Sequence, residues 1–586
     1  MDNFKNKWCF RFRAIDKRLV ILVVFTSLLF FFNLGVRDLW SPDEPRYSEV
    51  AKEMWDSGDY ILPHLNSEKY PDKPPIFFWL IILFSMPFGE IVALSARMPS
   101  AFAGIAGAVI TYYFGKRLFT PRIGLIAAML LSTSMEYLYH VRRVSIDGVL
   151  TMLVTLSLFC FYKGYVSSER GTRFFLISYM LMGIATITKG PVGFVLPVLV
   201  ISTFLIIVKV RNYQRVFRIQ DMRIGFGALI LFGIPLLWVF SIYHQGGWEH
   251  TTEVLFTQNI GRTVNSFSHN HPFYFYFIYF SLYFMPWSIF IPGTVISCLK
   301  IFNFWPYRIK RDSAVDDNNT TKVKHGLLFP AVWFAVIFIF FSVVSGKREG
   351  YILPLYPAAS LLVAWFLDSY ISAPLDKKFR KSCYLPLMIC YGVMIVMGIV
   401  FPFWVYYYHK SEFASVLPMT VIFIAGQVIS MRFLSSARPA KALITSFAVF
   451  LIMVMLCTRT IIPLINEKKS AKAFCENVNK IVKPDDNLAF AIFYRSAYLF
   501  YTGRNYIEVI DKAERMLEYV RTNEKVYLIL KEKNLETIMK DSDIVLYTLV
   551  KGAVGHRKLI LVTNKPDDNQ PNWDLENDTP YRDFPD

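Results

Sequence analysis

The chain has 586 residues, 54% of them hydrophobic, and a mean hydropathy of +0.37. A water-soluble fold of this length could not bury so many apolar side chains, so the composition indicates a membrane protein. The net charge of +18 could suggest nucleic-acid binding, but the Lys and Arg residues lie mostly in short loops between apolar runs. We therefore interpret the charge as a topology signal and expect no nucleic acid as a partner.

The N-terminus is basic and precedes an apolar stretch that has no small-residue cleavage site, so residues 19–36 are interpreted as a retained first span. A span needs about 20 apolar residues to cross roughly 30 Å of hydrocarbon. The sequence predicts about thirteen spans, at residues 19–36, 95–117, 121–140, 146–165, 173–188, 190–209, 224–243, 273–299, 326–345, 351–370, 383–407, 415–434 and 440–462.

A shorter apolar stretch at residues 75–89 is left out of this count. If it crossed the membrane, the basic loops would fall on both faces, whereas without it they share one face with the N-terminus. Basic loops mark the cytoplasmic side. We therefore expect a cytoplasmic N-terminus, an outer loop at residues 37–96, and residues 75–89 at the outer interface.

Residues 1–462 are thus expected to form a membrane domain. Beyond them, alternating amphipathic patterns predict a small α/β domain at residues 463–564, with strands at 488–493, 525–530, 544–549 and 559–563. This domain is expected on the outer side because the number of spans is odd. Residues 565–586 are acidic and contain Pro and Asn, so we expect a disordered tail.

The first outer loop concentrates acidic residues directly after the first span. One interpretation is structural: Asp43 or Glu44 caps a short helix that has Pro45 in its first turn. Capping explains one acid but not the whole cluster. The other interpretation is chemical, with Asp43 orienting or deprotonating an acceptor.

Basic residues in the same loop could stabilise the negative charge of a phosphate leaving group. The candidates are Arg46 and Lys73. Lys73 is favoured because Pro74 and Pro75 predict a helix start, where free N–H groups and the helix dipole attract an anion.

Specific motifs extend this interpretation: Asp43-Glu44-Pro45-Arg46-Tyr47, Gly58-Asp59, Pro63, Leu65-Asn66, Tyr70, Lys73-Pro74-Pro75, Trp79, Ala96-Arg97, Pro99-Ser100, Thr188-Lys189-Gly190-Pro191 and Tyr351-Ile352-Leu353-Pro354-Leu355-Tyr356-Pro357. With these motifs the chain resembles the bacterial relatives of protein O-mannosyltransferases. Within them it most resembles glycosyltransferase family 83, the 4-amino-4-deoxy-L-arabinose lipid A transferases.

The resemblance implies an α-helical polytopic protein with the C-type glycosyltransferase fold and about thirteen transmembrane helices, placed in the bacterial inner membrane. It implies an undecaprenyl-phosphate-linked sugar as donor and no nucleotide sugar. The acceptor would be lipid A or a related envelope glycan on the periplasmic side, and membrane lipids would surround the enzyme. A protein or another glycan is the alternative acceptor.

The resemblance also implies roles for individual residues. Asp43 corresponds to the essential carboxylate, with Glu44 beside it, and Asp147 resembles a second acidic position. A lone Asp147 could instead cap the helix that follows it. The residues implied to bind substrate are Arg46, Tyr47, Tyr70, Lys73, Lys347, Arg348 and Tyr351.

Two of these basic residues also have a plainer interpretation. Lys347 and Arg348 could be interfacial anchors that reach headgroups. Lys189 is expected to contact a headgroup, because a charge between two apolar spans is costly unless it reaches water or a partner.

No cofactor is required with certainty by these features. Family members can hold a divalent metal ion, which would correspond here to zinc or magnesium on Asp72 and either His269 or His271. Two His residues at i and i+2 are a weak metal signal.

A lipid or solute transporter is the alternative of another class. Transporters usually place ionisable groups near the middle of the bilayer. Here the acidic residues lie mainly in the outer loops, which favours an enzyme. The same cluster argues against a scaffold whose only role is to bind a partner.

Overall fold

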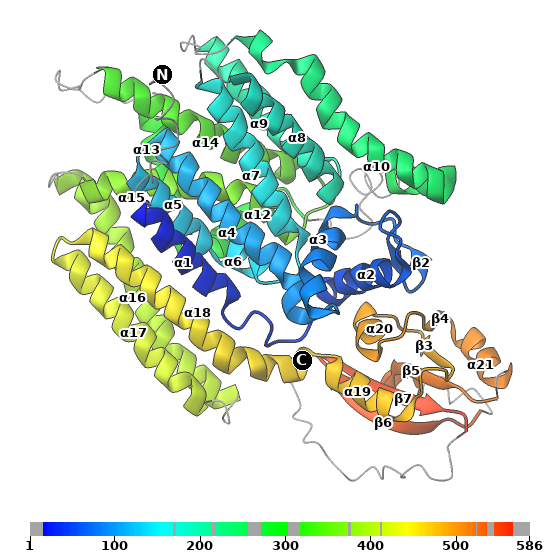
Figure 1. Cartoon of the computed structure of the whole chain (residues 1–586). Coiled ribbons are helices and arrows are strands. Elements are labelled where there is room, and N and C mark those ends of the chain that lie inside the picture. Colours follow the sequence, from blue (N-terminus) through cyan, green and yellow to red (C-terminus); the bar gives the residue numbers. More distant parts are fainter. Residues whose placement is uncertain are drawn as a thin grey trace, which may run out of the picture. The chain divides into compact units, whose positions relative to one another are not determined.

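A computed structural model describes residues 16–167, 171–211, 218–255, 271–302, 317–372, 377–408, 410, 413–522, 524–535 and 544–565 (Figure 1). The chain divides into two compact units. Unit 1 comprises residues 1–34, 71–80 and 97–461, and unit 2 comprises residues 35–70, 81–96 and 462–586. The predicted tail at 565–586 lies outside the described residues except for Lys565.

Unit 1 is built of apolar helices. In chain order they are α1 (Lys17–Phe31), the main part of α4 (Ala93–Leu118), α5 (Pro121–Ser132), α6 (Met135–Val141), α7 (Ile146–Tyr165), α8 (Gly171–Lys189), α9 (Val192–Val210), α10 (Ile224–Thr252), α12 (Phe275–Tyr283), α13 (Ile291–Ile301), α14 (Asp317–Val343), α15 (Tyr356–Ser372), α16 (Lys377–Tyr408), α17 (Phe413–Ser435) and most of α18 (Pro439–Lys469). Short 3-10 segments join some of them, including η2 (Ile219–Met222), η4 (Trp287–Phe290) and η5 (Glu349–Leu355).

Within the described part of the chain, ten helices are long and apolar enough to cross a membrane, or eleven if the bent pair α12 and α13 is one span. The helices α1 and α5 coincide with two further predicted spans but have only 15 and 12 residues. A fold of many apolar helices is confirmed, while the count of thirteen spans stays a prediction.

The predicted continuous spans at 121–140 and 273–299 are wrong. The first breaks between α5 and α6, where the hydroxyls of Thr133 and Ser134 donate to the carbonyls of Met129 and Leu131 at 2.7 and 2.8 Å. Such side-chain bonds compete with the helical ladder. The second span bends by 114° between α12 and the helix that includes α13, near Pro286, which lacks a backbone N–H.

Unit 2 joins the first loop to the C-terminal residues. It contains α2 (Asp43–Ser57), a hairpin of β1 (His64–Leu65) and β2 (Glu68–Lys69), η1 (Met86–Phe88), α19 (Lys472–Ile481), α20 (Ser496–Thr502) and α21 (Ala513–Thr522). The helix α3 (Ile76–Ser85) begins after Pro74-Pro75, as expected, and crosses the division between the units.

A five-stranded sheet forms the centre of unit 2, with strand order β4-β3-β5-β7-β6. Its strands are β3 (Leu488–Ala491), β4 (Glu508–Ile510), β5 (Tyr527–Lys531), β6 (Tyr547–Val554) and β7 (Arg557–Thr563). Strands β4, β3 and β5 are parallel to one another. Strand β7 is antiparallel to both of its neighbours, β5 and β6. Four strands lie near their predicted positions, but the three-residue β4 was not predicted.

Alternation along the strands gives the sheet two buried faces. Phe490 and Ile529 pack on one face with residues of α19 and α20. Ala489 and Leu528 pack on the other face with residues of α21. The sheet is thus the middle layer of three, with helices on both sides (Figure 1).

Candidate functional site

The acidic start of α2 carries the first group of predicted site residues, all within unit 2. Asp43 and Glu44 occupy the first turn of the helix, and the N-cap position is taken by Pro42. The Asp43 side chain is 44% exposed and forms an ion pair with the guanidinium of Arg46. Arg46 also lies over the ring of Tyr47, 5.3 Å from its centroid. The predicted acid and the predicted cation are therefore direct partners.

Glu44 has a different environment although it follows Asp43 directly. Its carboxylate is fully buried and accepts two bonds from Arg37, at 2.5 and 2.9 Å, and one from the backbone N–H of Trp40 at 3.1 Å. A bidentate Arg pair of this kind fixes the local backbone. The geometry favours a structural role for Glu44, which holds the loop that leads into α2.

The loop is also tied to distant residues of unit 2. Asp38 exchanges two hydrogen bonds with the side chain of Asn466, at 2.9 and 2.8 Å. The N–H of Leu39 donates to the hydroxyl of Tyr501 at 2.6 Å. Tyr70, another predicted substrate contact, is buried, and its N–H donates to the carbonyl of Pro63 at 2.8 Å.

A second group of predicted residues lies in unit 1, around the start of α7. Asp147 is in the first turn of this helix and forms an ion pair with Lys189, the last residue of α8. The ammonium of Lys189 lies 4.7 Å from the ring centroid of Tyr351. The expected headgroup contact of Lys189 is therefore wrong: its side chain is only 10% exposed and is held between an acid and an aromatic ring.

Lys73 belongs to the same unit and interacts electrostatically with Asp147. Its ammonium donates to the carbonyl of Asp72 at 3.0 Å. The structure thus brings together Lys73, Asp147, Lys189 and Tyr351 in unit 1. The two cations beside Asp147 are groups that can bind a phosphate.

The two basic residues before Tyr351 differ from each other. Lys347 is 3% exposed and donates to the carbonyls of Val344 and His271, at 2.7 and 3.0 Å. It satisfies one backbone carbonyl just past the end of α14 and another shortly before α12, so the interpretation as a headgroup anchor is wrong for Lys347. Arg348 is exposed, and its carbonyl accepts a hydrogen bond from Tyr276 at 2.9 Å.

The predicted metal residues are only partly described. His269 lies outside the described residues, while the ring of His271 stacks on Phe275 with centroids 4.4 Å apart. Among the described residues, no group of three His, Cys, Asp or Glu side chains could hold a metal ion. The zinc or magnesium site stays a prediction.

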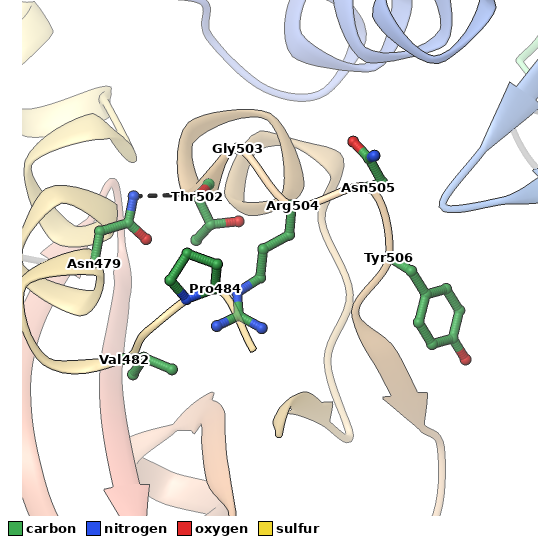
Figure 2. A pocket seen from close by; sticks show the side chains of 8 residues that line it. All are labelled: Asn479, Val482, Pro484, Thr502, Gly503, Arg504, Asn505 and Tyr506. Carbon is green, nitrogen blue, oxygen red and sulfur yellow. Dashed lines mark hydrogen bonds between the residues drawn. The ribbon is translucent and has the colours of Figure 1, made fainter. Parts of the chain in front are cut away.

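A cavity of about 480 Å³ lies elsewhere in unit 2, between α19 and the end of α20 (Figure 2). Figure 2 shows the side chains of Asn479 and Arg504 beside it. Arg504 donates to the carbonyls of Asp486 and Lys483, and Asn479 donates to those of Tyr501 and Thr502. These donors are already engaged with the backbone, so the cavity is not a candidate for phosphate binding.

Comparisons with known proteins find similarity to sugar transferases. Residues 72–238 match the family model of dolichyl-phosphate-mannose-protein mannosyltransferases. An undecaprenyl phosphate-alpha-4-amino-4-deoxy-L-arabinose arabinosyl transferase of Shewanella sediminis is 26% identical over 505 residues, which cover 83% of this chain and 86% of the relative. A second transferase of this name, from Proteus mirabilis, is 27% identical over 399 residues, which cover 66% of each chain.

The solved structure of ArnT from Cupriavidus metallidurans, bound to undecaprenyl phosphate, is 18% identical with a TM-score of 0.74. The match covers 94% of this chain and 99% of ArnT. The chain is a relative of these transferases and has their C-type glycosyltransferase fold. The predicted resemblance and fold class are confirmed. Together with these relatives, the many apolar helices support a multi-pass inner-membrane protein.

Some contacts of this transferase fold were not predicted from the sequence. The pairing of Lys189 with Asp147 joins residues 42 positions apart, and no local pattern indicates it. Glu136 and His140 near the same site were also not among the candidates. Their spacing of four residues was a usable signal, because such residues face the same side of a helix.

Proposed function

We propose that this chain transfers the amino sugar 4-amino-4-deoxy-L-arabinose from undecaprenyl phosphate to lipid A or a related envelope acceptor. The observation that carries the proposal is similarity over most of the chain to transferases named for this donor. The fold shared with ArnT, whose structure holds undecaprenyl phosphate, supports the same class of carrier.

The cations beside Asp147 suit the donor end of the reaction. Sugar transfer breaks the bond between the anomeric carbon and the phosphate oxygen, so negative charge collects on the carrier phosphate. Lys73 and Lys189 are both half-buried, which strengthens their attraction for that charge. Arg46 and Arg348 are proposed as further phosphate contacts.

Asp43 is proposed to act on the sugar or on the acceptor rather than on the carrier phosphate. A phosphate acceptor is already anionic at neutral pH and hardly needs a base. Asp43 would then orient the amine of the sugar or stabilise the positive charge that develops on the sugar ring. With a hydroxyl acceptor, the same carboxylate would remove a proton.

The proposed reaction takes place at the periplasmic face. The positive charge of the loops between the spans supports a cytoplasmic N-terminus and a first loop on the outer side. Unit 2 contains this first loop together with the C-terminal residues, so it is proposed to be periplasmic as a whole.

Mass spectrometry of lipid A from cells with and without the chain tests this function. We expect a mass increase of one amino-pentose that depends on the chain. If the increase appeared on a protein or another glycan, the enzyme class would hold and the lipid A acceptor would be wrong. If no carrier-linked sugar were consumed at all, the proposal as a whole would fail.

Two substitutions test the residue roles with purified protein and carrier-linked sugar. We expect Asp43→Asn to abolish transfer, and Lys73→Ala chiefly to weaken donor binding, roughly tenfold or more for a lost charged contact. Asp56→Asn is the matched control, because Asp56 is an exposed acid on the same helix as Asp43. Normal turnover by Asp43→Asn would remove its catalytic assignment.

A further inference from the structure

A buried hydrogen-bonded chain lies next to the Asp147–Lys189 pair in unit 1. It starts at Glu136, which is 1% exposed and lies on α6. One carboxylate oxygen accepts from the hydroxyl of Tyr279 at 2.7 Å, and the other lies 2.9 Å from Nε2 of His140. Since a carboxylate oxygen accepts, Nε2 carries the hydrogen of this bond. Glu136 thereby fixes both the tautomer and the orientation of the imidazole.

The other nitrogen of His140 leads to the start of α7. Nδ1 lies 2.7 Å from the hydroxyl of Ser145, the N-cap residue of this helix. The Ser145 side chain makes no capping bond to the helix, and its hydroxyl donates to Nδ1 of His140. The backbone of Ser145 is held separately by the hydroxyl of Ser100, at 3.0 and 3.1 Å. Asp147 follows two residues later.

A second contact links His140 to the acid through Gly350 in η5. A Cβ atom added to Gly350 would come within 2.8 Å of His140 Nε2 and 3.2 Å of Asp147 Cγ. The imidazole and the carboxyl group therefore lie against the same backbone position. The next residue, Tyr351, is the aromatic partner of Lys189.

We propose that His140 is a positioning residue that, through Ser145 and Gly350, holds Asp147 in the orientation in which it pairs with Lys189. This inference rests on the proposed function, in which that pair belongs to the donor site. The imidazole is clamped on both nitrogens and fills the space beside the acid. Loss of that support would let the carboxylate rotate away from Lys189, and displacements of about 1 Å at a reacting centre can cost roughly 100-fold in rate.

Substitution of His140 by Asn or Gln tests its two hydrogen bonds one at a time. Asn carries an amide at the position of Nδ1 and keeps the contact with Ser145, whereas Gln carries one near Nε2 and keeps the contact with Glu136. We expect His140→Ala to lower kcat about 10- to 100-fold with the donor KM changed less than about threefold. His140→Asn should restore more of kcat than His140→Gln, because the support of α7 runs through Ser145. If the role of His140 were purely structural, the loss of kcat would instead parallel the loss of thermal stability across all three variants.

Gly350→Ala tests the same contacts by adding a group next to His140 and Asp147 instead of removing one. Its new methyl group would displace the imidazole and the Asp147 carboxyl, so we expect a similar loss of kcat. Tyr139→Phe is the control, since Tyr139 is exposed on the same helix and keeps its ring. Wild-type kcat in both His140→Ala and Gly350→Ala would overturn the inference.

A measurement independent of transfer separates this inference from the proposed function. The amine of Lys189 can be labelled with a short pulse of an acylating reagent and quantified by peptide mass spectrometry. We expect labelling to rise severalfold in His140→Ala, less in His140→Asn, and not in Tyr139→Phe. Unchanged labelling in His140→Ala overturns the inference whatever the transfer assay shows. If the unaltered chain transfers no sugar but His140→Ala still increases the labelling of Lys189, the positioning role is supported and only the proposed function is overturned.

Discussion

Burial changes the chemistry of a single acid, Glu49, on α2 of unit 2. Its side chain is fully buried, and neither carboxylate oxygen has a hydrogen-bond partner among the described residues. The ammonium of Lys52 lies 3.5 Å from one oxygen. Burial penalises the charged form and raises the pKa of Glu49 to about 7, against an ordinary value of 4.5. The native state therefore holds a proton here at pH values where the unfolded chain has lost it.

The linkage predicts how stability changes with pH. The contribution of Glu49 is fully present below pH 4.5 and is lost as the pH rises toward 7 and above, by roughly 3 kcal/mol. Glu49→Gln keeps the shape without the charge. We expect the variant to match the unaltered chain at pH 4.5 and to melt at a higher temperature at pH 8.5, as measured by thermal unfolding in detergent.

Asp56→Asn serves as the control for this experiment, since Asp56 is exposed and shares the partner Lys52. It should change the pH dependence of melting much less than Glu49→Gln, because the charge of Asp56 is the smallest of the named contributions to the raised pKa of Glu49. An identical pH dependence in Glu49→Gln and the unaltered chain would show that Glu49 is not the group responsible.

The site residues could be chosen from the sequence, but their partners could not. Acids and cations next to a first span are unusual enough to attract attention, and Pro74-Pro75 correctly indicated a helix start. The sequence does not reveal that Glu44 is enclosed by Arg37 whereas the adjacent Asp43 is half exposed. That difference depends on which face of α2 becomes buried, and tertiary packing decides it.

At the scale of elements, the hairpin β1–β2 connects the first loop to the C-terminal sheet. Its turn residues Asn66 and Ser67 have φ values of 58° and 62°, a left-handed conformation that Asn tolerates better than most residues. Their N–H groups donate to the carboxylate of Glu53 at 2.6 and 3.0 Å. The side-chain amide of Asn66 also exchanges two hydrogen bonds with the backbone of Ile507, at 2.9 and 2.8 Å.

Replacement of Asn66 should loosen this connection. Asn66→Ala removes both bonds to Ile507, leaves buried backbone groups unsatisfied and disfavours the positive φ, for a cost of about 2 to 4 kcal/mol. We expect a lower melting temperature of the full chain and faster proteolytic cleavage in the hairpin. Ser67→Gly is the matched control, because Gly accepts the same φ and the backbone bond to Glu53 remains. Equal protease resistance of Asn66→Ala and the unaltered chain would contradict the assigned role.

Hydropathy predicted the bounds of a helix correctly where the apolar run forms a single continuous helix. The span predicted at 146–165 coincides with α7 at Ile146–Tyr165. The span predicted at 121–140 divides at Thr133 and Ser134, whose hydroxyls bind the carbonyls of Met129 and Leu131 at the end of α5. Hydropathy averages over such residues and cannot register a local competition for hydrogen bonds.

At the scale of the whole molecule, the orientation in the membrane can be tested directly. A reporter that is active only outside the cytoplasm, fused after Lys565, should be active, because the C-terminal residues are proposed to be periplasmic. The same reporter inserted after Val166, in a predicted cytoplasmic loop, should be inactive and provides the control. An inactive C-terminal fusion would mean that the predicted number of spans is wrong by one.

The hydrogen bonds between Asn66 and Ile507 join residues 441 positions apart. During synthesis, the first loop leaves the translocon long before the ribosome has reached the strands that complete its fold. Such distant pairing makes the final step slow, because a long stretch of chain must be ordered before the contact forms. The acid at the start of α2 is then held in its finished surroundings only after nearly the whole polypeptide has been made, so a prematurely terminated chain would insert into the membrane without gaining activity.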